Sequence, residues 1–164
     1  MKKLIEIVNI LQRTPNVIRE LCNHLPDDLA NKNEGGDSWS VFEVIGHLNH
    51  GERTDWITRM ELILSSTTNK TFTSFDRFAQ KEESKGKQLS ELIDEFAELR
   101  ENNLFILSSY ELIEEDLVKK GIHPELGEVN LEMLLNTWAT HDLNHIHQIT
   151  RVNKILISIR LKYY

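Results

Sequence analysis

Four long segments of this chain place apolar residues at helical spacing, and none alternates apolar and polar residues as a half-buried strand does. The segments cover roughly residues 4–25, 41–64, 89–108 and 131–152. Amphipathic helices of this length must bury their apolar faces against one another. The pattern therefore predicts an all-α fold, an antiparallel four-helix bundle, formed as one domain by residues 1–164.

Turn and cap residues set the expected limits of these helices. Ser40 and Glu43 form a capping box in front of the second helix, and Asn130 is the expected N-cap of the fourth. A loop is expected at residues 121–127, which include two glycines and a proline, and a short helix near residues 75–80. Pro15 lies inside the first segment, where a missing N–H predicts a kink or a restart of the helix.

Charge and composition exclude several classes of function. The formal net charge is −7 and no long basic run occurs, which disfavours binding to nucleic acid or to an anionic membrane. The apolar runs are too short to span a membrane, and the N-terminal one ends too early for a secretory signal. The single cysteine, Cys22, rules out an intramolecular disulfide and is expected as a buried structural thiol. We expect a cytoplasmic protein.

Three histidines of the fourth helix are sorted by the helical angle of 100° per residue. Relative to Trp138 on the apolar face, His145 lies about 20° away and His141 about 60° away. His147 lies about 180° from Trp138 and is expected to face water. Because His141 and His145 are four residues apart on one face, their rings can chelate a metal ion, although such pairs are more often packed or solvated residues.

Two histidines of the second helix differ in the same way. His47 lies at the edge of the apolar face, roughly 100° from its centre, whereas His50 lies almost opposite that face. His47 is therefore a candidate third ligand for the pair on the fourth helix. Helical angles alone do not establish that the rings meet.

Charged residues also interrupt the apolar faces, where a core would contain aliphatic side chains. They are Glu52, Asp55 and Arg59 on the second helix, Arg100 on the third and Asp142 on the fourth. Buried charges must be paired or line a wet cavity. Two interpretations stay open, an interior salt-bridge network that fixes the register of the helices, and a functional pocket whose carboxylates orient ligating histidines.

The chain resembles the DinB-like proteins over about residues 4–155. The resemblance is carried by Gly46-His47-Leu48, Gly51-Glu52, Asp55-Trp56, Arg59, Phe75-Asp76-Arg77, Glu95-Phe96, Leu99-Arg100, His123-Pro124-Glu125-Leu126-Gly127-Glu128-Val129, Thr137-Trp138-Ala139-Thr140-His141-Asp142-Leu143-Asn144-His145-Ile146 and Gln148-Ile149. It implies a four-helix bundle, often a dimer, that holds one divalent transition metal, zinc or nickel, through three histidines. By position these ligands are His47, His141 and His145. The segment 154–164 departs from the family pattern, and whether it covers the end of the bundle or a subunit interface stays open.

Three functions follow as hypotheses. Because the proteins that this chain resembles include thiol-dependent enzymes, the first hypothesis is a metal-dependent thiol S-transferase that acts on a small substrate together with a low-molecular-weight thiol. The second is a metal-dependent hydrolase, and the third is a non-catalytic metal-binding or ligand-binding stress protein. Three neutral imidazoles leave a metal its full charge and an open position, as catalytic sites do. Arg100 is expected to hold an anionic part of the substrate, and Asp142 or Glu52 to act as a general base or to fix a ligand's tautomer.

Overall fold

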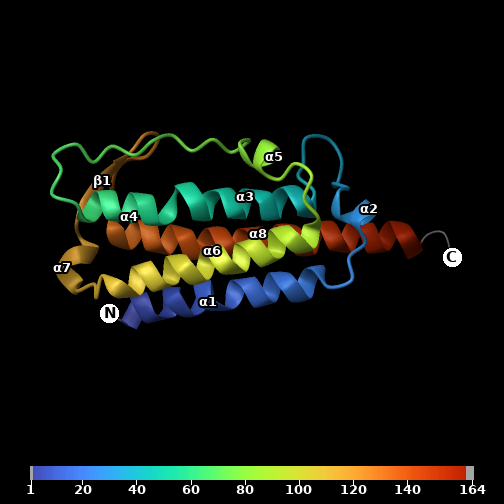
Figure 1. The fold of residues 1–164 in the computed structure, drawn as a ribbon, viewed down its shortest axis with the longest axis horizontal. Coiled ribbons are helices and arrows are strands. Elements are labelled where there is room, and N and C mark those ends of the chain that lie inside the picture. The colour runs from blue at the N-terminus through green and yellow to red at the C-terminus, as the bar shows by residue number, and fades with distance from the viewer. Residues whose placement is uncertain (1, 162–164) are drawn as a thin grey trace.

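The computed structural model describes residues 2–161 and consists mostly of helices (Figure 1). The long helices are α1 (Lys2–Cys22), α3 (Val41–Thr54) followed by α4 (Trp56–Leu64), α6 (Leu89–Ser109) and α8 (Leu131–Leu161). The connections contain the short helices α2 (Asp27–Ala30), α5 (Gln80–Glu83) and α7 (Glu114–Leu117), and the strands β1 (Lys120–His123) and β2 (Gly127–Asn130). The expected four-helix bundle is confirmed.

The bundle consists of four helical rods, α1, α3–α4, α6 and α8, which do not simply alternate in direction. Figure 1 shows α1 and α8 running one way, and α3–α4 and α6 running the other. Each rod therefore has one parallel neighbour, α1 beside α8 and α3 beside α6, and one antiparallel neighbour, α1 beside α6 and α3–α4 beside α8. This arrangement requires a long return connection, and residues 65–88 provide it along the outer side of α3.

The first helix continues through Pro15 instead of restarting there. Because proline has no N–H, the carbonyl of Leu11, four residues earlier, cannot receive its usual helical hydrogen bond. Arg100 from α6 supplies a donor instead, with its Nη1 2.9 Å from the Leu11 oxygen. The proline thus leaves a carbonyl free inside the bundle, and a buried side chain of another helix uses it.

The second rod is divided at Asp55, where the sequence predicts one uninterrupted helix. The Asp55 backbone has φ −112° and ψ −71°. Its N–H still bonds to the Gly51 carbonyl at 3.0 Å, and its carbonyl accepts from the Arg59 N–H at 2.9 Å. The rod therefore keeps its course, and α4 begins directly with Trp56. The capping box of Ser40 and Glu43 at the start of α3 is present as expected.

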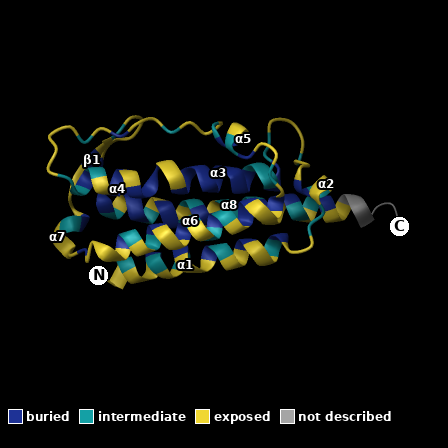
Figure 2. Ribbon diagram, viewed as in Figure 1, coloured by how far each residue is buried: buried dark blue, intermediate teal, exposed yellow. Residues whose placement is uncertain are grey.

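Helix α3 is enclosed on nearly all sides, as its dark colour in Figure 2 shows. Ten of its 14 residues are buried. Helix α5 packs directly on its backbone at Gly46, where an added Cβ would lie 2.5 Å from the Ser84 Oγ. His50 is therefore buried as well, and its Nδ1 lies 2.8 Å from an oxygen of Glu83. The expectation that His50 lies away from the interior is wrong, because the return connection covers the second face of this helix.

A small β-hairpin stands where the sequence predicts only a loop and no strand. β1 and β2 pair antiparallel, with Gly121 opposite Val129 and His123 opposite Gly127. Residue 122 also bonds to the return connection, since its N–H donates to the Lys70 carbonyl at 2.9 Å. Strands of four residues are too short for the alternation of side chains to be read from the sequence.

Two apolar clusters fill the bundle, one toward each end. Cys22 is buried in one of them, as expected, and Leu156 packs in the same cluster. Of the C-terminal segment 154–164, Leu156 therefore covers an end of the bundle, while Tyr163 and Tyr164 lie outside the described residues. Within residues 2–161, no helix combines the length and the apolar character needed to cross a membrane.

Candidate metal centre

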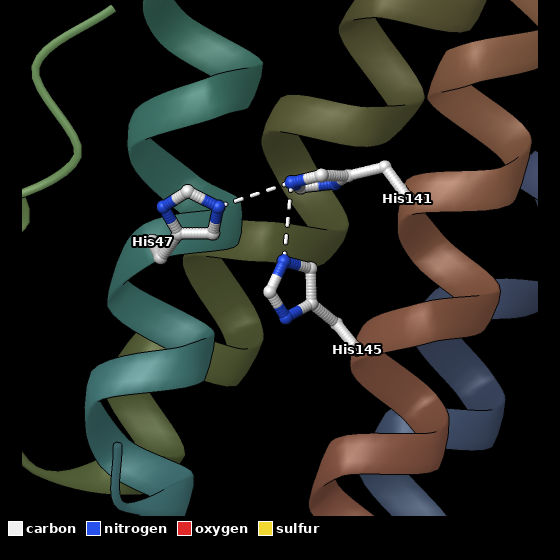
Figure 3. Close-up of side chains that lie close together, drawn as sticks. All are labelled: His47, His141 and His145. Carbon is white, nitrogen blue, oxygen red and sulfur yellow. Dashed lines mark hydrogen bonds between the residues drawn. The ribbon is translucent and has the colours of Figure 1, made fainter. Parts of the chain in front are cut away.

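Three histidines from two helices of the bundle point their rings at one another (Figure 3). The Nε2 atom of His141 lies 3.0 Å from that of His47 and 3.1 Å from that of His145. His47 comes from α3, and the other two lie one turn apart on α8. The ligand atoms all lie within 4.8 Å of one another. These are the histidines that the helical angles bring to the interior, and His147 is exposed as expected.

The contacts of His141 Nε2 have the spacing that a shared cation would require. An imidazole nitrogen carries either one proton or one lone pair, so hydrogen bonds to two other rings would have to share it. Nitrogens placed about 2.0–2.1 Å from a common ion lie roughly 2.8–3.4 Å apart in octahedral or tetrahedral geometry. The observed separations of 3.0 and 3.1 Å fall in this range.

The rings are also kept in the neutral state that metal ligation requires. Burial, aided by the charge of neighbouring His145, lowers the pKa of His47 to about 3 and that of His141 to about 2. Burial likewise lowers the pKa of His145, although the hydrogen bond to Gln148 opposes this shift. All three rings therefore offer a lone pair at neutral pH.

The Nδ1 atoms of the three rings indicate what holds the histidines in place. A histidine that ligates through Nε2 carries its proton on Nδ1 and usually donates it to a nearby acceptor. In His145 this partner is the amide oxygen of Gln148, 2.9 Å from Nδ1. The Nδ1 atoms of His47 and His141 are buried without a partner in the described part of the chain. The three residues fit a divalent transition metal, with one ligand oriented by a side chain and two held by packing.

A pocket of about 550 Å³ opens onto the three histidines. Aromatic rings form part of its wall: Trp39 lies 4.9 Å from the His47 ring, Phe75 5.3 Å from the same ring, and Trp56 5.2 Å from His141. Further lining residues come from the junction of α3 and α4, from α4 and α8, and from the return connection and the hairpin: Asp55, Arg59, Arg77, His123, Glu125, Gln148 and Arg151. Its size and mixed lining suit a small molecule.

The charges found inside the apolar faces form a network beneath this site. Arg100 is 1 % exposed and makes five hydrogen bonds, four of them to carboxylate oxygens of Glu52 and Asp142 at 2.6–3.1 Å. The fifth goes to the Leu11 carbonyl. All five donors of the guanidinium are therefore used within the protein. These charges also raise the pKa of Arg100 further above its ordinary value, although burial opposes this shift.

The same network fixes the neighbours of the histidines. Glu52 Oε1 accepts a 2.9 Å hydrogen bond from the indole N–H of Trp138, and its Oε2 accepts one of 3.0 Å from Asn103. Trp138 in turn stacks on Trp56, with ring centroids 5.7 Å apart. The network thus connects α3, α6 and α8 directly beside His141.

The three residues expected to take part in catalysis do not line the pocket. Glu52, Arg100 and Asp142 are buried and bonded to one another, so none of them has a free polar group facing a substrate. In particular, Arg100 is not placed to bind an anionic substrate. The geometry favours the interpretation as a salt-bridge network that positions the helices carrying the ligands.

Two other titratable side chains do line the pocket. Asp55 bonds to Arg59 at 2.7 Å, yet burial raises the pKa of its carboxyl group to about 6. His123 on the hairpin accepts backbone N–H bonds on Nδ1 from Glu125 and Leu126, which leaves its proton on Nε2. The sequence marked Asp55 only as one of the charged residues that interrupt the apolar faces. It indicated no role for His123, because the hairpin that brings it to the pocket was not foreseen.

A cluster of three neutral histidines, open to a pocket on one side and set inside a four-helix bundle, agrees with the arrangement that the DinB resemblance implies. The sequence model of the DinB superfamily matches residues 10–149, and the chain belongs to this superfamily.

Comparison with solved structures agrees with this assignment. YfiT from Bacillus subtilis, described as a probable metal-dependent hydrolase with an unusual four-helix bundle topology, superimposes with a TM-score of 0.79 at 19 % sequence identity. The match covers 93 % of this chain and 87 % of YfiT. A search of curated proteins gives no match.

Proposed function

We propose that this protein is a metal-dependent enzyme for small substrates, with hydrolysis as its reaction. The observation that carries the proposal is the convergence of three neutral histidine nitrogens on one side of an open pocket. Among residues 2–161, no cysteine, carboxylate or further histidine joins this cluster. Three protein ligands and an open side are the composition of catalytic metal sites, whereas structural sites are closed by four.

His47, His141 and His145 would hold the metal ion. A divalent metal in such a site acts as a Lewis acid toward a substrate oxygen and lowers the pKa of a water molecule or a thiol. Asp55 supports hydrolysis, because a carboxyl group with a pKa of about 6 can accept a proton near neutral pH. Glu52, Asp142 and Arg100 act as positioning residues that hold the ligand-bearing helices in register.

The likeness to YfiT supports hydrolysis as well, since that protein is described as a probable metal-dependent hydrolase. Thiol S-transfer is the rival reaction. It needs the same three ligands, but the nucleophile would be a substrate thiol, which makes a protein base unnecessary once the thiolate has formed. A metal-binding protein without catalytic activity is the third candidate, and it makes no use of Asp55.

The first experiment measures bound metal by mass spectrometry in protein purified without a histidine tag. We expect about one zinc or nickel ion per chain in the parent, and little in the His47→Ala, His141→Ala and His145→Ala variants. His147→Ala is the matched control, because this residue is exposed on the same helix as two of the ligands. A parent protein that takes up no metal even when zinc and nickel are offered would refute the proposal.

The second experiment separates the reactions. Zinc-loaded and nickel-loaded protein is screened against esters, amides and phosphoesters, and separately against electrophiles with low-molecular-weight thiols. Hydrolysis that falls about 100-fold in Asp55→Asn, with metal content unchanged, supports the proposed mechanism. Thiol-dependent turnover that is indifferent to Asp55→Asn would replace hydrolysis by S-transfer. No turnover in either screen favours the non-catalytic candidate.

A further inference from the structure

Arg77, an exposed residue of the return connection, lines the pocket of the three histidines and contacts aromatic rings instead of carboxylates. Its guanidinium lies 5.5 Å from the ring centroid of Trp39 and 5.5 Å from that of Phe78. Trp39 in turn packs on the ring of His47, with centroids 4.9 Å apart. Stacking fixes the plane of a guanidinium without using its N–H donors.

The other arginines of the pocket are already engaged. Arg59 bonds to the Asp55 carboxylate at 2.7 Å, and Arg151 bonds to Glu34 at 2.6 Å. Within the described part of the chain, Arg77 has neither an ion pair nor a hydrogen bond. It is thus the arginine of the pocket whose five donors are all free to bind a ligand.

The acidic residues of the pocket do not neutralise the charge of Arg77. Asp37 and Glu125 also line the pocket, and both are exposed. Neither forms an ion pair with Arg77. A positively charged group left free at the edge of a pocket attracts an anionic ligand.

We propose that Arg77 forms an oxyanion subsite, so that the substrate carries a carboxylate or phosphate group that Arg77 binds while the reacting bond lies at the histidines. This inference rests on the proposed function and identifies its substrate class. A planar guanidinium binds either group through two parallel hydrogen bonds. It also assigns to Arg77 the task that the sequence assigned to Arg100, whose donors are all used inside the bundle.

The experiment compares the binding of anionic probes with that of related neutral molecules. Benzoate is paired with benzamide, acetate with acetamide, and methyl phosphate with trimethyl phosphate. Each pair is titrated into zinc-loaded protein by calorimetry, with tryptophan fluorescence as a second readout because Trp39 lies under the guanidinium. The variants are Arg77→Gln and Arg77→Lys, and Arg13→Gln is the control, since Arg13 bonds to a backbone oxygen on the exposed side of α1.

We expect at least one anion to bind about tenfold more tightly than its neutral partner in the parent and in Arg13→Gln. This preference should disappear in Arg77→Gln and be intermediate in Arg77→Lys, which keeps the charge but not the two parallel bonds. A preference that persists in Arg77→Gln would show that the metal or another residue of the pocket holds the anion and would overturn the inference, as would a parent without any preference. Zinc content is measured in the same samples, so a parent that holds no zinc refutes the proposed function, whereas a zinc-loaded parent without preference refutes the subsite alone.

Discussion

Replacement of Arg100 by methionine is the most direct test of how the charges inside this bundle act. Methionine keeps much of the apolar volume of the side chain but removes the guanidinium. The change eliminates four hydrogen bonds to carboxylate oxygens and the bond to the Leu11 carbonyl. It leaves Glu52 and Asp142, both nearly inaccessible to water, without their cation.

The expected loss follows from the burial of these groups. Removing one partner of a buried ion pair costs about 3–5 kcal/mol, because the charge left behind is neither solvated nor paired. Two carboxylates lose their partner here, so we expect Arg100→Met to lower the free energy of unfolding by about 4–5 kcal/mol. For a domain of this size that corresponds to a fall in Tm of roughly 10–15 °C.

Urea denaturation followed by circular dichroism measures the effect on metal-free protein. The decisive comparison is the triple variant Arg100→Met with Glu52→Gln and Asp142→Asn, which also removes the uncompensated charges. It should be more stable than Arg100→Met alone by about 2 kcal/mol or more. Arg19→Met is the control, because the Arg19–Asp94 pair is largely exposed and should contribute under about 1 kcal/mol.

Two results would refute this reasoning. A loss below about 1 kcal/mol in Arg100→Met would show that the carboxylates find other partners or solvent in the folded variant. A triple variant less stable than the single variant would show that hydrogen-bond geometry, and not uncompensated charge, determines the cost.

Three further predictions concern pH, the ligand environment and the hairpin. The metal-free protein should lose stability as the pH falls from 6.5 toward 3, by up to about 1.4 kcal/mol per pH unit for each of the three histidines. The reason is that the imidazoles of the unfolded chain bind protons in this range, whereas the buried rings of the folded protein, whose pKa values are lowered, stay neutral. Asp55 acts in the opposite direction between about pH 4 and 6, because its raised pKa in the folded state increases the stability of the protein as the pH falls. A stability, measured by denaturation, that stays constant or increases as the pH falls from 6.5 to 5 would contradict the prediction. Gln148→Leu removes the acceptor of the His145 Nδ1 proton and should weaken zinc affinity about 10–100-fold in a competition titration; unchanged affinity would mean that this bond does not orient the ring. Gly121→Ala should destabilise the protein by about 1–3 kcal/mol, because the new Cβ would lie 2.6 Å from the Phe72 ring, and a neutral result would show that the ring moves freely.

The four helices and the neighbouring pair of histidines on the fourth helix could be predicted because both depend on residues close together in the chain. Helical spacing of apolar residues shows which face of a helix is buried, whatever packs against it. His141 and His145 share one turn of α8, so local geometry already places their rings together. The third ligand, His47, needed the family resemblance as well, because its position at the edge of an apolar face does not say which helix lies opposite.

The surroundings of His50, Pro15 and Arg100 depended on segments far apart in the sequence. His50 is buried because the return connection and α5 cover the second face of α3. The carbonyl that Pro15 leaves free is reached by Arg100, 85 positions later. Neither contact leaves a periodic pattern, since each depends on where a distant segment comes to lie.

The difference between what the sequence determined and what the tertiary structure decided therefore has a physical cause. The sequence by itself determined the helical faces, the chelating pair and the presence of charges that needed partners, because hydrogen bonds and side-chain periodicity within a helix are local. Only the tertiary structure decided which charges pair and which stay free. It placed Arg100 among the carboxylates of two other helices and left Arg77 stacked on aromatic rings at the edge of the pocket, so that the first stabilises the bundle and the second is available to a ligand.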